Sequence, residues 1–211
     1  MKKIRLFGLP IIMVLFWACS SGTDTDFWTY KSGMQAYISD TKEFTEDATL
    51  KVSSDGVSID AGKIVKGKVY LELPKTLDAS YLTTSDDGTI PPTTTCSAWF
   101  FSPDVIVDGK VIGNLQFSKD IWVEGWDVEK ELNQMSFRYY SNDCTVTRKS
   151  TGQWKSVTIQ MEWNLKMKKG WNAILGIGTY DKNVDPKNAT RLFTSDLSKA
   201  PADMKWVIYL W

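Results

Sequence analysis

The sequence predicts an all-β protein folded as an antiparallel β-sandwich, with a barrel-like closure as the alternative. Short apolar runs recur at roughly even spacing between turn signals, and no long segment has the periodicity of a helix. The clearest run covers residues 157–167, where every second residue is apolar and each residue between is polar. Because successive side chains of a strand point to opposite faces, this run is predicted to be a strand with one buried and one solvated face.

A chain reversal is predicted directly after this strand. Lys168-Lys169-Gly170 interrupts the alternation, and glycine tolerates the positive φ that a short hairpin requires. Residues 171–180 are apolar again, so they are predicted to form a second strand that pairs back on the first. The rest of the predicted fold is arranged around this hairpin.

The remaining strands are short and follow from the same two signals, alternation and turn chemistry. Ser54-Asp55-Gly56 and Asp108-Gly109 each separate two apolar segments, which predicts two further hairpins. Pro74 ends a strand at residues 65–73, and residues 83–95, rich in Thr, Ser and Pro, are predicted to form a long exposed loop. Further strands are predicted at residues 96–101, 115–123, 135–140, 145–148 and 204–211, the last apolar on both faces like a strand buried within a sheet.

Composition excludes several classes of protein. The 211-residue chain has no histidine, which excludes Ser-His-Asp and Cys-His catalysis and any zinc site with a histidine ligand. Lys plus Arg equal Asp plus Glu at 25 each, and removing residues 1–18 takes away three cations and no acid, leaving 22 − 25 = −3. Nucleic-acid binding needs a clustered basic surface, so a nucleic-acid partner is not expected.

The N-terminus has the pattern of a secretory signal peptide. Lys2, Lys3 and Arg5 precede a largely apolar stretch, residues 6–17, and the small residue Ala18 follows. This order predicts a signal peptide at residues 1–18. An apolar stretch this short is not expected to persist as a membrane-spanning helix.

The residues around the expected cleavage point carry a family resemblance. Phe16-Trp17-Ala18-Cys19 resembles the lipobox of bacterial lipoproteins, in particular the relaxed lipoboxes of Bacteroidetes and spirochaetes. The resemblance implies that Cys19 is acylated and becomes the N-terminus of the mature protein. Ser20 after the cysteine implies sorting to the outer membrane, so the protein is expected to be lipid-anchored there, facing the periplasm or the cell surface.

The C-terminal half is similar to a loose set of exported bacterial lipoproteins without an assigned activity. The similarity covers residues 155–207 and rests on the alternating strand, the Lys168-Lys169-Gly170-Trp171-Asn172 hairpin and Lys205-Trp206 near the end. It implies fold and location but no chemistry. The expected organisation is the signal peptide, a lipidated flexible tether at residues 19–34 and a single β-sandwich domain at residues 35–211.

Two cysteines remain besides Cys19, namely Cys96 and Cys144. An exported protein reaches an oxidising compartment, where such a pair can form a disulfide. On the chain-entropy estimate, a bridge over a loop of this length contributes roughly 4 kcal/mol. The alternative is two separate buried thiols, and the sequence leaves both open.

Trp122, Trp126 and Asp127 are the candidate ligand-binding residues. The two tryptophans flank Glu124-Gly125 in an otherwise polar stretch. An exposed tryptophan beside carboxylates is typical of sugar binding, because the ring contacts the apolar face of a sugar while the acids bind its hydroxyls. The alternative is that both tryptophans pack in the core, as most tryptophans of this chain are expected to do.

Catalytic and metal sites are weaker hypotheses. The acidic residues between 120 and 131 could serve a glycosidase without histidine, but such a cluster is usually a solvated surface. Asp181 begins a segment that resembles a calcium-binding loop, yet Pro186 replaces the glycine that this loop requires. No cofactor, metal ion or catalytic residue is therefore predicted.

The sequence thus favours a cell-envelope lipoprotein that acts as a non-catalytic binding or adhesion module, with glycan as a candidate ligand. The alternative is a structural or assembly component that contacts other envelope proteins, and a weaker alternative is a carbohydrate-active enzyme without histidine. An exposed aromatic surface would favour the first, an uncovered strand edge the second, and facing carboxylates the third. The expected partners are the membrane, through the N-terminal lipid, and a glycan or an envelope protein.

Overall fold

The computed structural model describes residues 27–38, 42–54, 57–78, 98–119, 132–154, 157–181, 183 and 188–210. Its regular structure consists of strands and one short 3₁₀ helix, so the prediction of an all-β protein is confirmed. The strands in chain order are β1 (Phe27–Thr29), β2 (Met34–Tyr37), β3 (Ala48–Ser54), β4 (Val57–Val65), β5 (Lys68–Pro74), β6 (Ala98–Phe101), β7 (Asp104–Val107), β8 (Lys110–Ser118), β9 (Leu132–Tyr140), β10 (Cys144–Trp154), β11 (Val157–Met167), β12 (Gly170–Asp181), β13 (Asn188–Thr194) and β14 (Lys205–Leu210). The 3₁₀ helix η2 (Leu197–Lys199) lies between β13 and β14.

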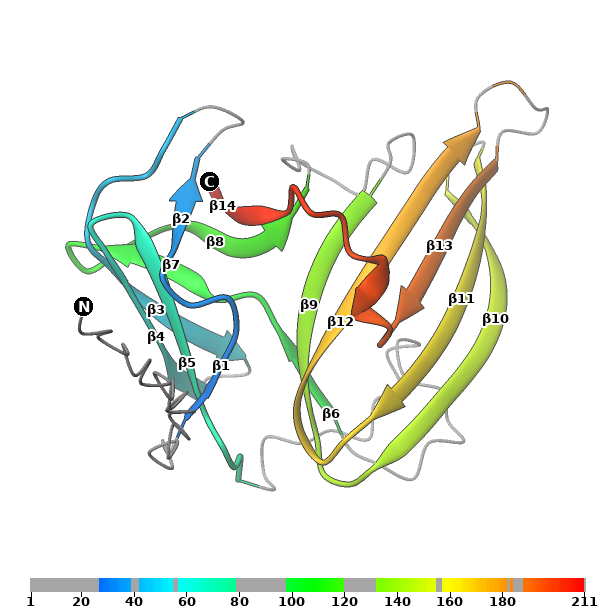
Figure 1. Cartoon of the computed structure of the whole chain (residues 1–211), viewed down its shortest axis with the longest axis horizontal. Helices are drawn as coiled ribbons and strands as arrows, with labels where there is room; N and C mark the ends of the chain where they lie inside the picture. Colours follow the sequence, from blue (N-terminus) through cyan, green and yellow to red (C-terminus); the bar gives the residue numbers. More distant parts are fainter. Residues whose placement is uncertain are drawn as a thin grey trace, which may run out of the picture.

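Seven of these strands form a closed barrel, which lies on the left in Figure 1. The order of hydrogen-bonded neighbours is β8-β14-β2-β5-β4-β3-β7, and β7 pairs back on β8 to close the ring. Neighbours in the ring are antiparallel except β14 and β2, which run parallel. The all-β fold therefore takes the barrel-like closure that the sequence left as the alternative to a sandwich.

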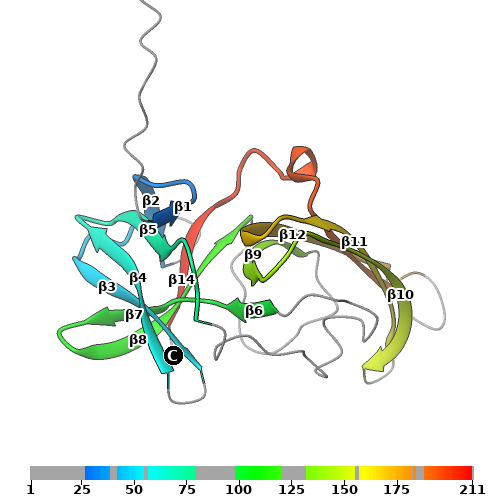
Figure 2. The ribbon, with the colours of Figure 1, turned by 90° about the horizontal axis from the view of Figure 1, so that it is seen from below.

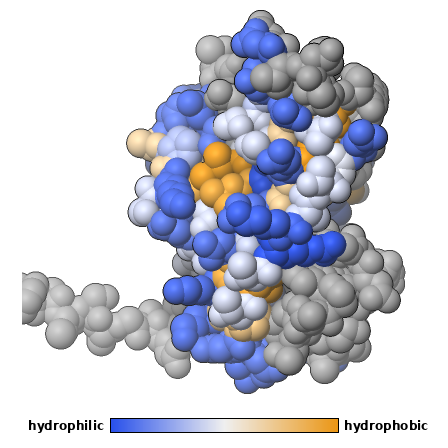
Figure 3. All heavy atoms as spheres, turned by 90° about the vertical axis from the view of Figure 1, so that its right-hand side faces the viewer, coloured by the Kyte–Doolittle hydropathy of each residue, from blue (hydrophilic) through white to orange (hydrophobic). Residues whose placement is uncertain are grey.

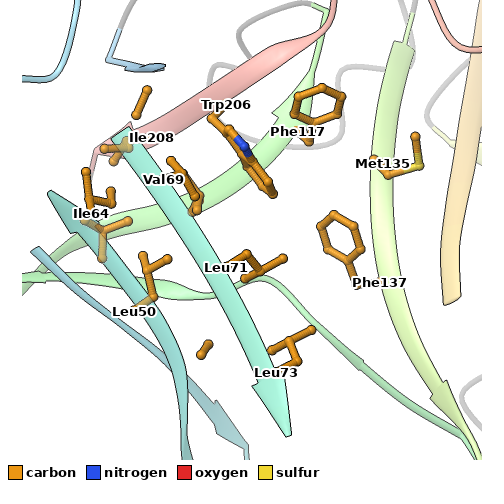
Figure 4. Packing of buried hydrophobic residues seen from close by; sticks show 14 of the residues in the cluster. Leu50, Ile64, Val69, Leu71, Leu73, Phe117, Met135, Phe137, Trp206 and Ile208 are labelled. Carbon is orange, nitrogen blue, oxygen red and sulfur yellow. The ribbon is translucent and has the colours of Figure 1, made fainter. Parts of the chain in front are cut away.

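Apolar side chains fill the interior of the barrel. In β5, Val69, Leu71 and Leu73 point inward and are each 0–1% exposed. Lys68, on the other face of the same strand, is exposed. Figure 4 shows these leucines and valine pointing into one space shared with side chains from other strands, among them Leu50, Ile64, Phe117, Trp206 and Ile208. In the part of the chain that the structure describes, the barrel is a packed core stabilised by apolar burial.

A second, curved sheet continues from the barrel and lies on the right in Figure 2. Its order is β10-β11-β13-β12-β9, and β9 joins it to the barrel by pairing with the end of β8. Farther along the same edge, β9 pairs with the short strand β6. The core of the barrel extends onto one face of this sheet through Tyr139, Trp171 and Leu175. The barrel and this face of the curved sheet therefore share a hydrophobic core, and two smaller clusters, around Trp163 and around Val157, lie elsewhere in the curved sheet.

The alternating stretch forms β11, and its predicted faces are confirmed. Leu165 is 1% exposed and Trp163 is 6% exposed, whereas Asn164 and Lys166 between and beside them are exposed. The Trp163 ring stacks on the Phe193 ring of β13, with centroids 5.4 Å apart and planes within 17°. The buried face of β11 thus packs inward, and its other face meets solvent.

Replacing Trp163 with alanine is expected to lower the free energy of unfolding by about 3–5 kcal/mol, because the change leaves a large cavity beside Phe193. Lys166→Ala, on the exposed face of the same strand, is the matched control and should change it by less than about 0.5 kcal/mol. Urea denaturation of both variants measures the difference. Comparable losses for the two variants would show that the assignment of faces is wrong.

The predicted pairing of the strand at residues 171–180 with β11 is wrong. β12 follows β11 after a tight reversal, but β13 lies between the two, parallel to β11 and antiparallel to β12. The other edge of β12 pairs with β9. A turn specifies only that the chain reverses. Which strands pair is decided by how all the strands fit side by side in the sheet. Here β13 forms seven residue pairs with β11 and seven with β12.

Two side chains hold the reversal between β11 and β12. The Asn172 carboxamide accepts a hydrogen bond from Lys168 N (2.9 Å) and donates to the Lys168 carbonyl (2.7 Å) and the Gly170 carbonyl (2.8 Å). The Asp143 carboxylate accepts from Lys168 Nζ and from Lys169 N, both at 2.8 Å. These hydrogen bonds lower the pKa of the Asp143 carboxyl, and the bond from the Lys168 side chain has the largest effect. Gly170, with φ of 98°, supplies the predicted positive φ.

Trp171 anchors this reversal to the barrel. Its indole Nε1 donates a hydrogen bond to the Pro74 carbonyl at the end of β5, at 2.7 Å. Its ring meets the Tyr139 ring edge-on, with centroids 5.4 Å apart. The Lys-Lys-Gly-Trp-Asn segment therefore has a structural role: one part shapes the turn and Trp171 fastens the curved sheet to β5.

The expected tether at residues 19–34 overlaps the folded part of the chain. β1 lies within it and pairs with β5, with Trp28 opposite Leu73. The Trp28 ring stacks on Tyr30 at 6.0 Å, and both rings contact Phe137. Burial of these aromatic rings outweighs the polar character of their neighbours in sequence, so the fold includes residues from Phe27 onward.

Candidate functional site

The residues that the sequence singles out for function lie mostly outside the described residues. This holds for the lipidation residue Cys19, for the candidate ligand-binding residues Trp122, Trp126 and Asp127, and for Cys96. Their roles stay predictions. Cys144, the first residue of β10, is the exception.

Cys144 is disulfide-bonded, and its partner lies outside the described residues. β6 pairs with β9 so that Ala98 lies opposite Tyr140, and the short turn 141–143 connects Tyr140 to Cys144. The described start of β6, two residues after Cys96, therefore lies next to the turn that leads into Cys144. This register favours Cys96 as the partner of Cys144, one of the two possibilities that the sequence left open.

A bridge between Cys96 and Cys144 predicts that Cys144→Ser lowers the free energy of unfolding by about 2–4 kcal/mol. Cys96→Ser should cause the same loss, and the double variant no further loss, because either change removes the same bond. Peptide mapping under non-reducing conditions gives the pairing directly. A linkage of Cys144 to Cys19, or a free thiol at Cys96, would contradict it.

The three arginines in the described part of the chain lie on the same face of the curved sheet as Trp163. They are Arg138 in β9, Arg148 in β10 and Arg191 in β13. Arg138 is 8% exposed and Arg191 4% exposed. Burial lowers the pKa of the Arg191 guanidinium, and burial raises the pKa of the Tyr140 hydroxyl, an effect that neighbouring Arg138 partly offsets. Around Arg138 and Arg191, this face is too deeply buried to be an open ligand surface.

Gly178 in β12 makes room for the buried side chain of Arg191 in β13. Gly178 lies opposite Arg191 in the ladder, and a Cβ at Gly178 would overlap the guanidinium. Arg191 Nη1 donates to the Thr190 carbonyl at 3.0 Å. Gly176 lies opposite Phe193, where an added Cβ would make an ordinary contact of 3.4 Å with the ring. Gly178, a glycine inside a strand pattern, is the sequence signal for the close packing at Arg191.

β10 is the outermost strand of the curved sheet, at the far right in Figures 1 and 2. Of the described strands, only β11 pairs with it, in an unbroken register from Cys144↔Met167 to Trp154↔Val157. It is 11 residues long, contains no proline and has no register shift. In an antiparallel ladder every second residue of such an edge strand directs its N–H and C=O away from its neighbour.

The two charged side chains of β10 point onto the sheet rather than beyond its edge. Lys149 Nζ lies 3.1 Å from the Glu162 carboxylate of β11. The Arg148 guanidinium lies over the Trp163 ring, 5.5 Å from its centroid. Natural sheets protect edges with short strands, bulges, prolines or charges, and of these features β10 has the two cations.

The outer face of β10 is polar and exposed. Thr145, Thr147, Thr151 and Gln153 alternate along it with Lys149 at the centre. Figure 3, from the side on which β10 and β11 lie in Figure 1, shows a largely hydrophilic surface around a small apolar patch. The face of β10 that carries these side chains is therefore solvated.

In comparisons with known proteins, no family model, no curated protein and no solved structure matches this chain. Within the residues that the structure describes, no three His, Cys, Asp or Glu side chains are grouped to hold a metal ion. No helix in that part of the chain is long and apolar enough to cross a membrane.

Proposed function

We propose that this protein is a non-catalytic binding module of the cell envelope that contacts other proteins through the edge of its curved sheet. The observation that carries the proposal is β10, an 11-residue strand with an unbroken register, of which only one edge is paired among the described strands. An extended segment of a partner can add to such an edge as one more strand.

The geometry supports binding because the edge is held rigidly. β10 is fixed along its whole length by β11, which is itself fixed by β13 on its other side. A rigid ladder holds the outward N–H and C=O groups of β10 at the spacing of a strand. Little free energy is then lost in ordering β10 when a partner binds. Main-chain hydrogen bonds then supply affinity, and the side chains beside them supply specificity.

Photo-crosslinking in intact cells tests the proposal. p-Benzoylphenylalanine replaces Thr151, which is exposed on β10, and in a matched control it replaces Lys63, which is exposed on β4 between two paired neighbours. The Thr151 variant is expected to give a discrete protein adduct, and the Lys63 variant none. Adducts of the same kind from both positions, or from neither, would overturn the proposal.

The cell-envelope location rests on the basic, apolar and Ala18-Cys19 order of the N-terminus. Cys19→Ala is expected to abolish acylation and to leave the protein uncut or released in soluble form. Ser20→Ala, next to it, should keep the lipid. Metabolic labelling with a radioactive fatty acid measures both, and a label that persists in Cys19→Ala would exclude Cys19 as the anchor.

A glycan is the alternative ligand, held by Trp122, Trp126 and Asp127. Stacking on single rings is weak, so a polysaccharide with repeating units would gain by avidity. A glycan array with the wild type and Trp126→Ala distinguishes this alternative from protein binding. Loss of glycan binding with an unchanged unfolding midpoint would support it.

A further inference from the structure

We infer that the strand added to β10 is β10 of a second copy of this chain, antiparallel to the first and with Ser150 opposite Ser150. This inference rests on the proposed function, since it names the chain that the edge binds. Among the described strands β10 pairs with β11 alone, and the other end of the curved sheet is joined to the barrel through β9. A second copy would therefore continue the curved sheet across β10.

The register follows from which residues of β10 would face each other. Two identical antiparallel strands are related by a two-fold axis, so one residue lies opposite itself and the residues on either side of it face each other in turn. With Lys149 at the axis, two lysines would be directly opposite, and like charges in that arrangement destabilise a strand pair. With Ser150 at the axis, residues 146–154 of the two copies overlap and two small hydroxyl side chains meet at the centre.

On the exposed face of β10, this register brings polar side chains together and places no like charges directly opposite. Lys149 lies opposite Thr151, and Thr147 lies opposite Gln153; all four are exposed. Lys149 also keeps its ion pair with Glu162 of β11, at 3.1 Å on the side away from the added strand. The polar groups of this face therefore keep their contacts with solvent or with β11 when the second copy is added, so little desolvation opposes the pairing.

On the other face, the register places Arg148 opposite Gly152. Arg148 extends over the Trp163 ring of its own copy, 5.5 Å from the centroid, and so leans away from the added strand. At Gly152 the contact found for an added Cβ is an ordinary one, 3.7 Å from Met161 Cε. A long side chain thus meets a position without a side chain, and Arg148 keeps the contacts that it already makes. Long opposite short on one face and polar opposite polar on the other make β10 complementary to itself.

The assembly is expected to be a weak dimer that stops at two copies. An interface between identical surfaces related by a two-fold axis is closed, because each copy uses the same edge. A single pair of strands is a small interface, and small interfaces are typically transient. The lipid proposed at Cys19 would hold both copies on one membrane and so raise their effective concentration.

Disulfide trapping tests the register on the full-length protein. Directly opposite residues have Cβ atoms about 4.5–5.5 Å apart, close enough for two thiols to be trapped as a disulfide. Ser150→Cys is therefore expected to give a disulfide-linked dimer on a non-reducing gel after mild oxidation. Thr147→Cys is the matched control, because residue 147 would lie opposite residue 153 and not opposite itself. This variant and the wild type should stay monomeric on the same gel.

Charge variants of Thr151 test the pairing in solution. Thr151→Glu puts a carboxylate opposite Lys149 of the other copy, twice by symmetry, and should lower the Kd of the dimer about 5-fold. Thr151→Lys should raise the Kd by a similar factor. Thr49→Glu and Thr49→Lys make the same charge changes at an exposed residue of β3, between the paired strands β4 and β7, and should leave the Kd unchanged. Sedimentation equilibrium measures the Kd, and circular dichroism checks that each variant is folded.

The outcomes separate this inference from the proposed function. Monomers at every concentration, together with a cellular adduct from position 151 to a protein of another mass, would overturn the second copy as the occupant and leave strand addition intact. No self-association and no adduct would overturn both. Dimers without a link at Ser150→Cys and with a Kd that the Thr151 variants do not change would show that another surface dimerises, and would overturn the inference.

Discussion

Replacing Trp206 with alanine is expected to lower the free energy of unfolding by about 5 kcal/mol, the upper end for a buried tryptophan. Trp206 is 0% exposed and lies in β14, which pairs with both β8 and β2 in the barrel ring. Its ring meets Phe117 at 5.1 Å, Phe137 at 6.0 Å and Tyr30 at 6.5 Å between centroids. Truncation would leave a cavity at the centre of the core in Figure 4.

The indole N–H of Trp206 adds a polar contribution to this loss. Nε1 donates a hydrogen bond to the Lys31 carbonyl at 3.1 Å, in the turn between β1 and β2. Without the indole, that carbonyl loses its partner, which costs about 1 kcal/mol. Trp206 therefore joins the N-terminal strands to the C-terminal strand by packing and by one hydrogen bond.

Guanidinium denaturation of three variants separates these contributions. Trp206→Phe keeps an aromatic ring and loses the N–H. Its free energy of unfolding should therefore lie between those of the wild type and Trp206→Ala. Leu210→Ala is the control on the same strand, because Leu210 is 55% exposed. It should change the free energy of unfolding by less than about 0.5 kcal/mol. Equal losses for Trp206→Ala and Leu210→Ala would show that Trp206 is not part of the packed core.

Gly62→Ala is expected to destabilise the fold by about 3–5 kcal/mol, because a backbone contact and a dihedral angle both require glycine there. Gly62 has φ of +111° and a Cβ added to it would overlap the Tyr70 carbonyl oxygen of β5. The pairing of β3 with β4 also shifts register next to Gly62, between Leu50 and Lys51. A positive φ costs an alanine roughly 1–3 kcal/mol, and displacing the β5 backbone costs a similar amount.

Gly109→Ala is the matched control for Gly62→Ala. Gly109 also has a positive φ, +75°, but nothing lies within 4 Å of an added Cβ. It should therefore show the dihedral cost alone, roughly 1–2 kcal/mol. Thermal or chemical denaturation compares the two variants. If both lose the same free energy, the close approach of β4 and β5 is not important for stability.

The elements that could be predicted from the sequence are those specified by neighbouring residues. The hairpin of β7 and β8 is one example, since Asp108 and Gly109 have φ of 49° and 75°, the positive values that a two-residue turn requires. β14 is another: its apolar residues on both faces predicted an interior strand, and Trp206, Val207 and Ile208 are all buried. Turn chemistry and alternation act over a few residues, so a single sequence reveals them.

The candidate binding edge could not be predicted in this way. The residues of β10 alternate like those of other strands, and its sequence predicted a strand only over residues 145–148, shorter than the 11 residues observed. Its long partner β11 extends it, because residue 154 of β10 still pairs with residue 157 of β11. Whether a strand lies at an edge depends on every other strand in the sheet, which alternation does not encode.

By itself, the sequence determined the all-β class, the faces of β11, the tight turns and the interior character of β14. Only the tertiary structure decided that β13 separates β11 from β12, that seven strands close into a barrel and that β10 is left at the edge. The physical reason is that side-chain pattern and turn residues act locally, whereas backbone hydrogen bonds are the same for every residue and do not specify which strand pairs with which. Partner choice follows from packing the whole core, through contacts such as those of Trp206 and Trp171 that join segments far apart in the chain.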